Sequence, residues 1–339
     1  MTRTVGGKIT GAVIAVFGAS LVAFLFMRVL PGDPARLIVG PLATQQAIEE
    51  QKKAMGLDQP LWVQYWRYIK GFFTGDWGFS YSTGQTVAHE MGARLPASAE
   101  LGLCAFTFAF TFAIVFALLA TYRHRPVVDG TVRGVSFLGL GTPPFWFGLI
   151  ILLLFSQVWH IFPGPDGRLG PNTTPPPSVT HFYTIDALIA GQWATFKDAF
   201  MHLILPSLAL GLAVFAYLVR LLRANLLDIS RENFIVVARS TGHGRWSAFS
   251  GYALPNAFLP TLTAAGLVFA QLLAGSVLVE RVFNWPGVGG LVVDSILRQD
   301  YAVVQTFVLL SAVLYVVVNL GVDVLYGVVD PRVRIPVTS

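Results

Sequence analysis

The chain has 339 residues, of which 54% are hydrophobic and only 12% carry a charge. Soluble globular proteins carry about 25% charged residues, so this composition indicates a membrane protein. A net charge of +5 would suit a nucleic-acid partner, but such proteins gather basic and stacking aromatic residues on one soluble face. Here the basic residues lie in short loops between apolar stretches, and we expect no nucleic-acid partner.

The first predicted element is a membrane helix within residues 1–30, after a short N-terminal segment. Two basic residues before an apolar core are typical of a secretion signal, but this apolar run is too long and has no small-residue cleavage site, so we expect it to stay attached. Residues 31–97 follow and contain many aromatic residues, among them Trp62, Trp66 and Trp77. Aromatic surface of this extent can pack a small subdomain, which we predict to be extracytoplasmic.

Five further membrane helices are predicted within residues 98–335, the core of the chain. The stretches 101–122 and 134–159 carry no charge, and each is long enough to cross the hydrocarbon core of a bilayer. An extracytoplasmic loop over 161–200 follows, and its consecutive prolines favour a stiff, extended connection. The apolar stretch 203–219 is the next predicted span.

The last two spans follow a polar loop over residues 223–256. The apolar run that begins in this loop is too long for one span, and we expect Pro255 and Pro260 to break its first part. The fifth span then starts near Ala257, and the uncharged stretch 301–322 is the sixth. The predicted fold is all-α and polytopic, with six transmembrane helices.

Lys and Arg residues are distributed unequally between the loops on the two sides. Positive residues beside membrane helices mark the cytoplasmic side. One set of loops holds most of them, whereas the other set holds only Arg168, Lys197 and Arg298. This asymmetry predicts that both termini and the 223–256 loop lie in the cytoplasm.

The sequence carries no motif for nucleotide hydrolysis or metal binding. It has no GxxxxGK[ST] and no HExxH, and its single cysteine, Cys104, excludes a CxxC site. Ionisable groups at membrane depth are functional candidates by default. However, Asp323, Glu280 and Arg220 fall at span ends, which favours structural pairing or interface anchoring over proton coupling. We therefore expect a transport protein with no catalytic residue and no metal site.

The cytoplasmic loop shows helical periodicity on both sides of Gly242. Before this glycine, four residues fall on one helical face at i, i+3, i+4 and i+7: Phe234, Val237, Ala238 and Thr241. Gly242 is expected to end the first short helix in a left-handed conformation, and a second short helix follows. Small side chains would let a cytoplasmic partner dock closely. On periodicity alone, an amphipathic segment on the lipid surface fits equally well.

Several segments of the chain resemble one known family. The loop sequences VVARSTG and NAFLP resemble the coupling motif of bacterial ABC importer permeases, an Ala-containing helix, a glycine and a later Leu-Pro. RVLPGDPA, GLDQPLWVQYWRYIKGFFTGDWGFS and VFNWPGVGGLVVDSILRQDYAVVQ are similar to the permeases for dipeptides, oligopeptides and nickel, in their dipeptide-type first subunit. The resemblance covers nearly the whole chain.

This resemblance implies the type I importer fold and a permease subunit that forms half of a pathway for short peptides. The implied partners are a homologous second permease subunit, two cytoplasmic ATPase subunits, an extracytoplasmic substrate-binding protein and membrane lipids. ATP and magnesium would be bound by the ATPases, and this chain would hold no cofactor of its own. The implied location is the bacterial cytoplasmic, or inner, membrane.

The resemblance also assigns roles to residues. Coupling to the ATPases is expected from five residues of the loop: Glu232, Phe234, Ala238, Arg239 and Gly242. Polarity and helix-breaking chemistry suggest four residues for the substrate path: Pro143, Pro144, Gln271 and Ser276. An ion-coupled secondary transporter that acts without an ATPase is the alternative, and it would need an ion gradient instead of ATP.

Overall fold

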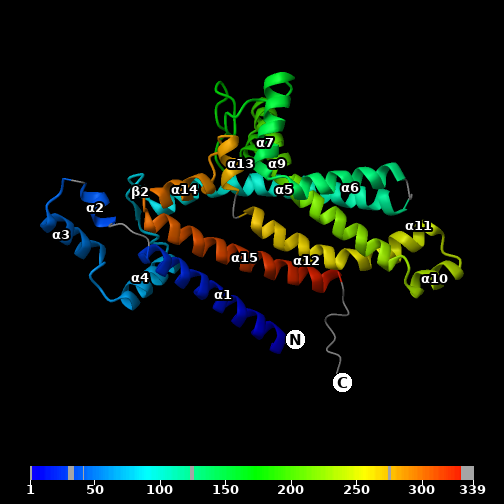
Figure 1. The fold of residues 1–339 in the computed structure, drawn as a ribbon, viewed down its shortest axis with the longest axis horizontal. Coiled ribbons are helices and arrows are strands. Elements are labelled where there is room, and N and C mark those ends of the chain that lie inside the picture. Colours follow the sequence, from blue (N-terminus) through cyan, green and yellow to red (C-terminus); the bar gives the residue numbers. More distant parts are fainter. Residues whose placement is uncertain (1, 30–33, 41, 123–125, 274–275, 330–339) are drawn as a thin grey trace. The chain divides into compact units, whose positions relative to one another are not determined.

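The computed structural model describes residues 2–29, 34–40, 42–122, 126–273 and 276–329. Most of these residues lie in helices, and the strands among them form a short antiparallel hairpin. The chain divides into two compact units, unit 1 with Met1–Leu95 and Val288–Val316, and unit 2 with Pro96–Gly287 and Val317–Ser339. The ribbon in Figure 1 shows the helical elements of both units. The predicted all-α class is confirmed.

Unit 1 consists of the N-terminal elements and part of the C-terminal region. Its elements are α1 (Thr2–Val29), α2 (Pro34–Val39), α3 (Gln45–Met55), α4 (Leu61–Thr74), β1 (Phe79–Ser80), β2 (Gln85–Thr86) and α14 (Val288–Leu297). The start of α5 (Val87–Tyr122) and of α15 (Tyr301–Val329) also belong to it. Tyr68 donates its hydroxyl to the Gln305 carbonyl at 2.9 Å, and Ser80 donates to the Asp300 carboxylate at 2.6 Å. These bonds tie the aromatic segment 34–95 to α15 and its start.

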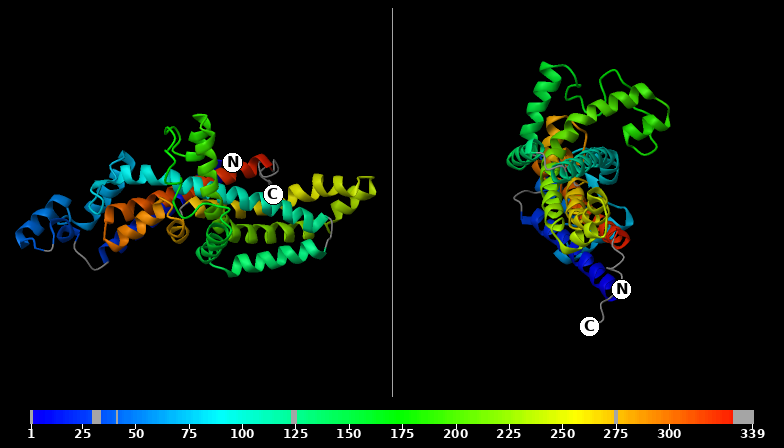
Figure 2. Two further views of the ribbon diagram at one scale, coloured as in Figure 1. Left: turned by 90° about the horizontal axis from the view of Figure 1, so that it is seen from above. Right: turned by 90° about the vertical axis from the view of Figure 1, so that its right-hand side faces the viewer.

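Unit 2 contains the rest of α5 and the elements up to residue 287. These are α6 (Pro126–Gly141), α7 (Pro144–Leu152), η1 (Leu153–Val158), α8 (Tyr183–Ile189), α9 (Trp193–Ile229), α10 (Asn233–Ser240), α11 (Arg245–Ala248), η2 (Phe249–Ala253), α12 (Leu254–Leu273) and α13 (Val277–Val282). The segments η1 and η2 are π-helical. Helix α9 packs against α6, α7, α8 and α12. Figures 1 and 2 show α6 and α9 side by side.

The core of unit 2 depends on small residues spaced four apart along α5. Ala109, Ala113 and Ala117 are all buried, in one cluster with Val214, Leu218 and Leu222 of α9. A Cβ atom on Gly211 of α9 would lie only 3.0 Å from the carbonyl oxygen of Ala105. Membrane helices associate through such small-residue contacts because lipid is as apolar as the side chains it replaces.

Five of the described helices are long and apolar enough to cross a membrane. The segments are Thr10–Val29, Val87–Tyr122, Trp193–Ile229, Arg245–Leu273 and Tyr301–Val322. The pair Gly130–Gly141 and Pro144–Val158 meets the same criterion together, which gives up to six spans. The chain is a multi-pass membrane protein of the predicted polytopic class.

The predicted span over 134–159 is present as two helices that meet at a sharp bend. Helix α6 ends at Gly141, α7 begins at Pro144, and the two are bent by 109°. Figure 1 shows α7 turning away from α6. Neither Pro143 nor Pro144 has an N–H, and a proline disfavours helical backbone in the residue before it. Two consecutive prolines therefore end one helix, and the second of them starts the next.

The prediction that Pro255 and Pro260 interrupt the helix at the start of the fifth span is wrong. Helical structure continues from Arg245 to Leu273, and Pro260 lies inside α12. The π-helical segment η2 ends at Ala253, two residues before Pro255. Its wider hydrogen-bond spacing accommodates the missing N–H, as local π adjustments do for prolines in membrane helices.

The 161–200 loop is fixed to α5 by a buried ion pair. Arg168 donates to the Glu100 carboxylate at 2.7 Å, and both side chains are buried. Glu100 also accepts hydrogen bonds from the Thr184 N–H and hydroxyl, and the guanidinium lies 3.5 Å from the Tyr183 ring centroid. Both Glu100 oxygens and the Arg168 Nη2 atom keep hydrogen-bond partners when the pair leaves water, which helps a buried ion pair to be tolerated. The expected extended connection covers only the first half of this loop, because α8 and the start of α9 occupy the rest.

Asp186 organises the turn that precedes α8. Its carboxylate accepts the Thr180 N–H and hydroxyl, both at 2.7 Å, and the Val179 N–H at 3.3 Å. Burial alone would raise the pKa of Asp186, but these hydrogen bonds to the charged form outweigh burial and lower that pKa. The ionised carboxylate therefore stabilises the turn.

Packing at Gly139 of α6 allows a stability test. A Cβ there would lie 2.8 Å from Ala216 Cβ and 3.0 Å from the Leu212 carbonyl oxygen, whereas Gly134 on the same helix has open space. We expect Gly139→Ala to destabilise unit 2 by about 1–3 kcal/mol through overpacking. The control Gly134→Ala should be neutral or stabilising by up to about 1 kcal/mol, because alanine favours helix. Thermal unfolding in detergent measures both, and equal midpoints would contradict the close contact of α6 and α9.

Acidification tests the Asp186 turn. Because the pKa of Asp186 is lowered on folding, its stabilising effect is complete above the ordinary Asp pKa of about 4 and is lost as the pH falls through the folded pKa. Hydrogen-exchange protection of the Thr180 amide should therefore fall at acid pH. Asp186→Asn should show reduced protection with little pH dependence, while Asp166→Asn, an exposed change in the same loop, should behave as the wild type. An unchanged acid profile in Asp186→Asn would show that another group controls the turn.

Candidate functional site

The predicted coupling loop forms two short helices joined by a tight turn. Glu232 is the residue before α10, with an extended backbone, and its carbonyl accepts the Ile235 N–H at 3.0 Å. Its side chain is exposed and makes no capping hydrogen bond. The carboxylate therefore lies at the positive N-terminal end of α10 and is accessible to a partner.

The buried face of α10 differs from the predicted one. Ile235 and Ala238 are buried, each 6% exposed, and Ile235 belongs to the core cluster with α9 residues. Phe234 and Val237, which we grouped with Ala238, are 41% and 58% exposed. Four consecutive apolar residues, FIVV, offer two adjacent faces, so periodicity alone could not select the inward one. Thr241 is also exposed.

Gly242 ends α10 as predicted. Its φ of 94° is in the region that favours glycine. The Gly242 N–H bonds to the Arg239 carbonyl at 3.2 Å, and the His243 N–H bonds to the Ala238 carbonyl at 3.1 Å. These two bonds form a Schellman motif, which satisfies carbonyls that a helix end leaves free. The loop turns at a defined position with a defined hydrogen-bond pattern.

The second short helix is attached to the end of α5. Arg245 donates to the Tyr122 carbonyl at 3.0 Å, and the Trp246 and Tyr122 rings pack edge to face at 4.9 Å between centroids. Tyr122 also packs against Phe249, which is buried with Ala248 and Ala253. By helical spacing Trp246 shares one face with Phe249, Ser250 and Ala253, and this face is only partly inward, since Trp246 is exposed. Our sequence reasoning missed Tyr122, although an aromatic residue at a span end is a known sign of an interface position.

The outer side of this loop is apolar with basic residues around it. Phe234, Val236, Val237 and Trp246 are exposed although large and hydrophobic. Arg239 is exposed and, with Arg231 and Arg245, lines a cavity of about 250 Å³ beneath α10 and α11. Exposed apolar patches of this kind mark sites that contact a protein or a membrane.

The candidate pathway residues lie on three elements. Pro143 precedes α7 and Pro144 is its first residue, while Ser276 directly precedes α13, which packs against α7. Gln271 is exposed on α12. The assignment of these four residues to a substrate path stays a prediction.

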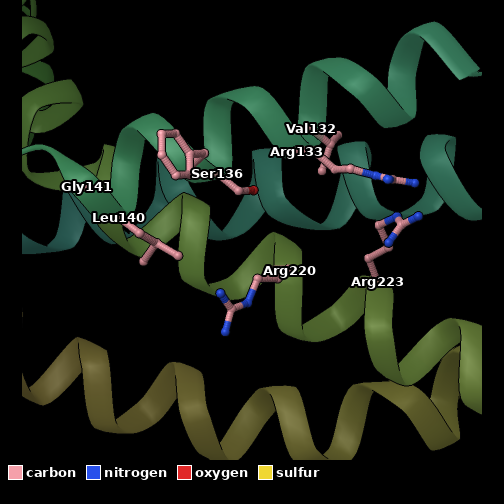
Figure 3. A pocket seen from close by; sticks show the side chains of 8 residues that line it. Val132, Arg133, Ser136, Leu140, Gly141, Arg220 and Arg223 are labelled. Carbon is pink, nitrogen blue, oxygen red and sulfur yellow. The ribbon is translucent and has the colours of Figure 1, made fainter.

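Two of the three ionisable groups at span ends are described with their side chains. Glu280 is buried and accepts a 2.7 Å hydrogen bond from the Ser98 hydroxyl. A Cβ on Gly287 would collide with both side chains, so the pair is tightly enclosed, as expected for structural pairing. Arg220 is exposed and lines a pocket between α6 and α9 (Figure 3). The side chain of Asp323 is outside the described residues.

Comparisons with known proteins agree with this architecture. Residues 109–335 match the family "Binding-protein-dependent transport system inner membrane component", and residues 1–102 match the corresponding N-terminal family. A probable D,D-dipeptide transport system permease protein of Escherichia coli is 40% identical over 323 residues, 95% of each chain. A dipeptide transport system permease protein of the same species is 39% identical over 328 residues, 96% of each chain.

A more distant relative carries a different substrate name. A glutathione transport system permease protein of Escherichia coli is 35% identical over 327 residues, which is 96% of this chain and 97% of that protein. All three matches span nearly the full length of both chains, and the two family matches together cover almost all of residues 1–335. The chain therefore belongs to the family of binding-protein-dependent transport system inner membrane components, as a permease subunit rather than an enzyme.

Proposed function

We propose that this chain forms half of the translocation pathway of an ATP-driven importer for short peptides. The dipeptide permeases among its relatives support the substrate class, and the family supports the dependence on a separate binding protein. In this proposal a homologous second permease subunit completes the pathway in the bacterial inner membrane. Two cytoplasmic ATPase subunits bind ATP and magnesium, and the chain itself holds no cofactor.

The observation that carries the proposal is the coupling loop. Ile235 and Ala238 fix α10 to the core of unit 2, and Arg245 fixes α11 to the end of α5. The residues on the outer side are left exposed while the backbone is firmly attached. Such an element can transmit a movement of a docked partner to α5 and α9, because packed helices move as rigid bodies. We assign the docking surface to Glu232, Phe234, Ala238, Arg239 and Gly242, with Ala238 as the buried support.

The ion-coupled alternative gains no support from the two carboxylates buried next to the membrane helices of unit 2. Glu280 and Glu100 are buried, but each carboxylate accepts hydrogen bonds within unit 2, and Glu100 pairs with Arg168. In our proposal the coupling loop and both termini lie in the cytoplasm, where an ATPase would reach the loop, and the distribution of positive residues supports this orientation.

Reconstitution distinguishes the two mechanisms. We expect uptake of a labelled dipeptide into proteoliposomes only when the second permease, the ATPases, the binding protein and ATP are all present. Uptake by this chain alone with a proton or sodium gradient and no ATP would contradict the proposal. A vesicle preparation that contains an ATPase variant unable to hydrolyse ATP serves as the control.

The Gly242 turn provides a matched pair of variants. The space around Gly242 is open, so a substituent there tests backbone strain rather than packing. Gly242→Val should weaken ATPase binding about fivefold to thirtyfold, because a β-branched residue in left-handed conformation costs roughly 1–2 kcal/mol. Gly242→Asn should bind nearly as the wild type, since Asn tolerates this conformation. Copurification of the ATPases measures both, and equal binding by the two variants would show that the turn does not position the docking surface.

A further inference from the structure

Helix α4 of unit 1 exposes a row of large aromatic side chains. Trp62, Trp66 and Phe73 fall at i, i+4 and i+11, which places them on one face of the helix. These three residues, the aromatic row, are 73%, 65% and 66% exposed. Another face of α4 packs inside unit 1 through Tyr65 and Tyr68. Exposed large apolar side chains in one patch mark a surface that contacts a protein or a membrane, so the row has a partner of one of these two kinds.

The inner face of α4 is attached to α1 inside the membrane-spanning stretch Thr10–Val29 (Figure 1). The Tyr65 hydroxyl lies 2.8 Å from the Ser20 hydroxyl and donates to the Phe17 carbonyl at 3.3 Å. The Tyr65 ring packs edge to face on Phe24, with 5.4 Å between centroids. Ser20 precedes the end of this stretch by nine residues, which is about 13 Å along a helix that rises 1.5 Å per residue. Helix α4 therefore packs on a part of α1 that lies within the bilayer.

A second membrane span, Tyr301–Val322 of α15, also contacts α4. The Tyr68 hydroxyl donates to the Gln305 carbonyl at 2.9 Å, and Gln305 lies four residues into this span. The Tyr68 ring also stacks on Phe24 of α1, with 6.3 Å between centroids. Two membrane spans thus hold α4 at once, and together they fix its depth in the bilayer.

Helix α3 provides a contrast within the same segment of the chain. Its exposed side chains include polar and charged groups, namely Gln46, Glu49, Glu50 and Lys53. The sequence of α4 has no acidic residue, and its exposed cations Arg67 and Lys70 lie to one side of the aromatic row. Long basic side chains beside an apolar face can reach lipid phosphates while their stems lie along hydrocarbon. The exposed side of α3 suits water, whereas that of α4 suits the boundary of a membrane.

We propose that α4 is an interfacial helix whose aromatic row contacts the lipids around the C-terminal end of α1. These lipids belong to the outer leaflet in the orientation proposed above. Tryptophan is enriched at the membrane–water boundary because its ring is apolar and its N–H is polar. Helix α4 then anchors the segment 34–95 to the membrane surface, with α3 on the water side. This inference requires neither the substrate class nor the ATP dependence of the proposed function.

Spin labels measure which medium contacts the aromatic row. The full-length chain is reconstituted with the second permease and the ATPases into nanodiscs of phosphatidylethanolamine and phosphatidylglycerol. Its single cysteine, Cys104, is replaced by Ala, and a nitroxide is attached in turn to Trp62→Cys, Trp66→Cys and Phe73→Cys. We expect each label to collide more often with oxygen, which concentrates in lipid, than with a water-soluble nickel chelate.

Reference labels define the two environments. Val22 is exposed within the α1 span, and Val22→Cys should report lipid. Glu49→Cys and Lys53→Cys on α3 should favour the nickel chelate instead. Collision with the chelate as frequent at the aromatic row as on α3 would overturn the proposal. So would shielding of the row from both reagents, before or after the binding protein is added, because a protein would then cover it.

A second measurement does not depend on labelling. Lipids that carry bromine near their headgroups quench nearby tryptophan fluorescence, and the double variant Trp62→Phe, Trp66→Phe keeps an aromatic ring at both positions. We expect the fluorescence intensity that these lipids remove to be smaller in the double variant than in the wild type. Trp285→Phe, which replaces a buried tryptophan, should leave that intensity unchanged. Equal quenching of the double variant and the wild type would contradict lipid contact at the aromatic row.

Discussion

Close packing between α5 and α9 is the contact on which unit 2 depends. In a bilayer the surrounding lipid is as apolar as the helix surfaces, so association relies on close van der Waals contact. The buried alanines at four-residue spacing on α5 and Gly211 on α9 supply that contact. With α9 fixed in this way, α8 lies near its start and α10 follows its end, and both are positioned by the same helix.

The coupling loop gains its rigidity from neighbours on either side. A short helix of eight residues is not stable alone, and α10 is held by Ile235 in the core and by the Schellman hydrogen bonds at its end. Tyr122 supplies the second attachment, because Arg245 and Trp246 both contact it. Movement of the loop is thus coupled to α5 and α9, the two helices whose packing forms the core.

Buried charges in unit 2 serve to hold segments together. Glu100 and Arg168 join the loop 161–200 to α5, and Glu280 with Ser98 closes a second contact. Each carboxylate has its hydrogen bonds satisfied within the protein, which explains why carboxylates are tolerated beside apolar helices.

The sequence by itself determined the all-α class, five of the membrane helices, the end of α10 at Gly242 and the family, because these follow from apolar length, local conformational preference and contiguous motifs. Only the tertiary structure decided that Pro143 and Pro144 bend a span while Pro255 and Pro260 do not. It also decided that Ile235 rather than Phe234 faces inward, and that Tyr122 anchors the loop. Each of these outcomes depends on which neighbouring helix lies alongside, and contacts between residues more than 100 positions apart, such as Tyr122 and Arg245, leave no local pattern in the chain.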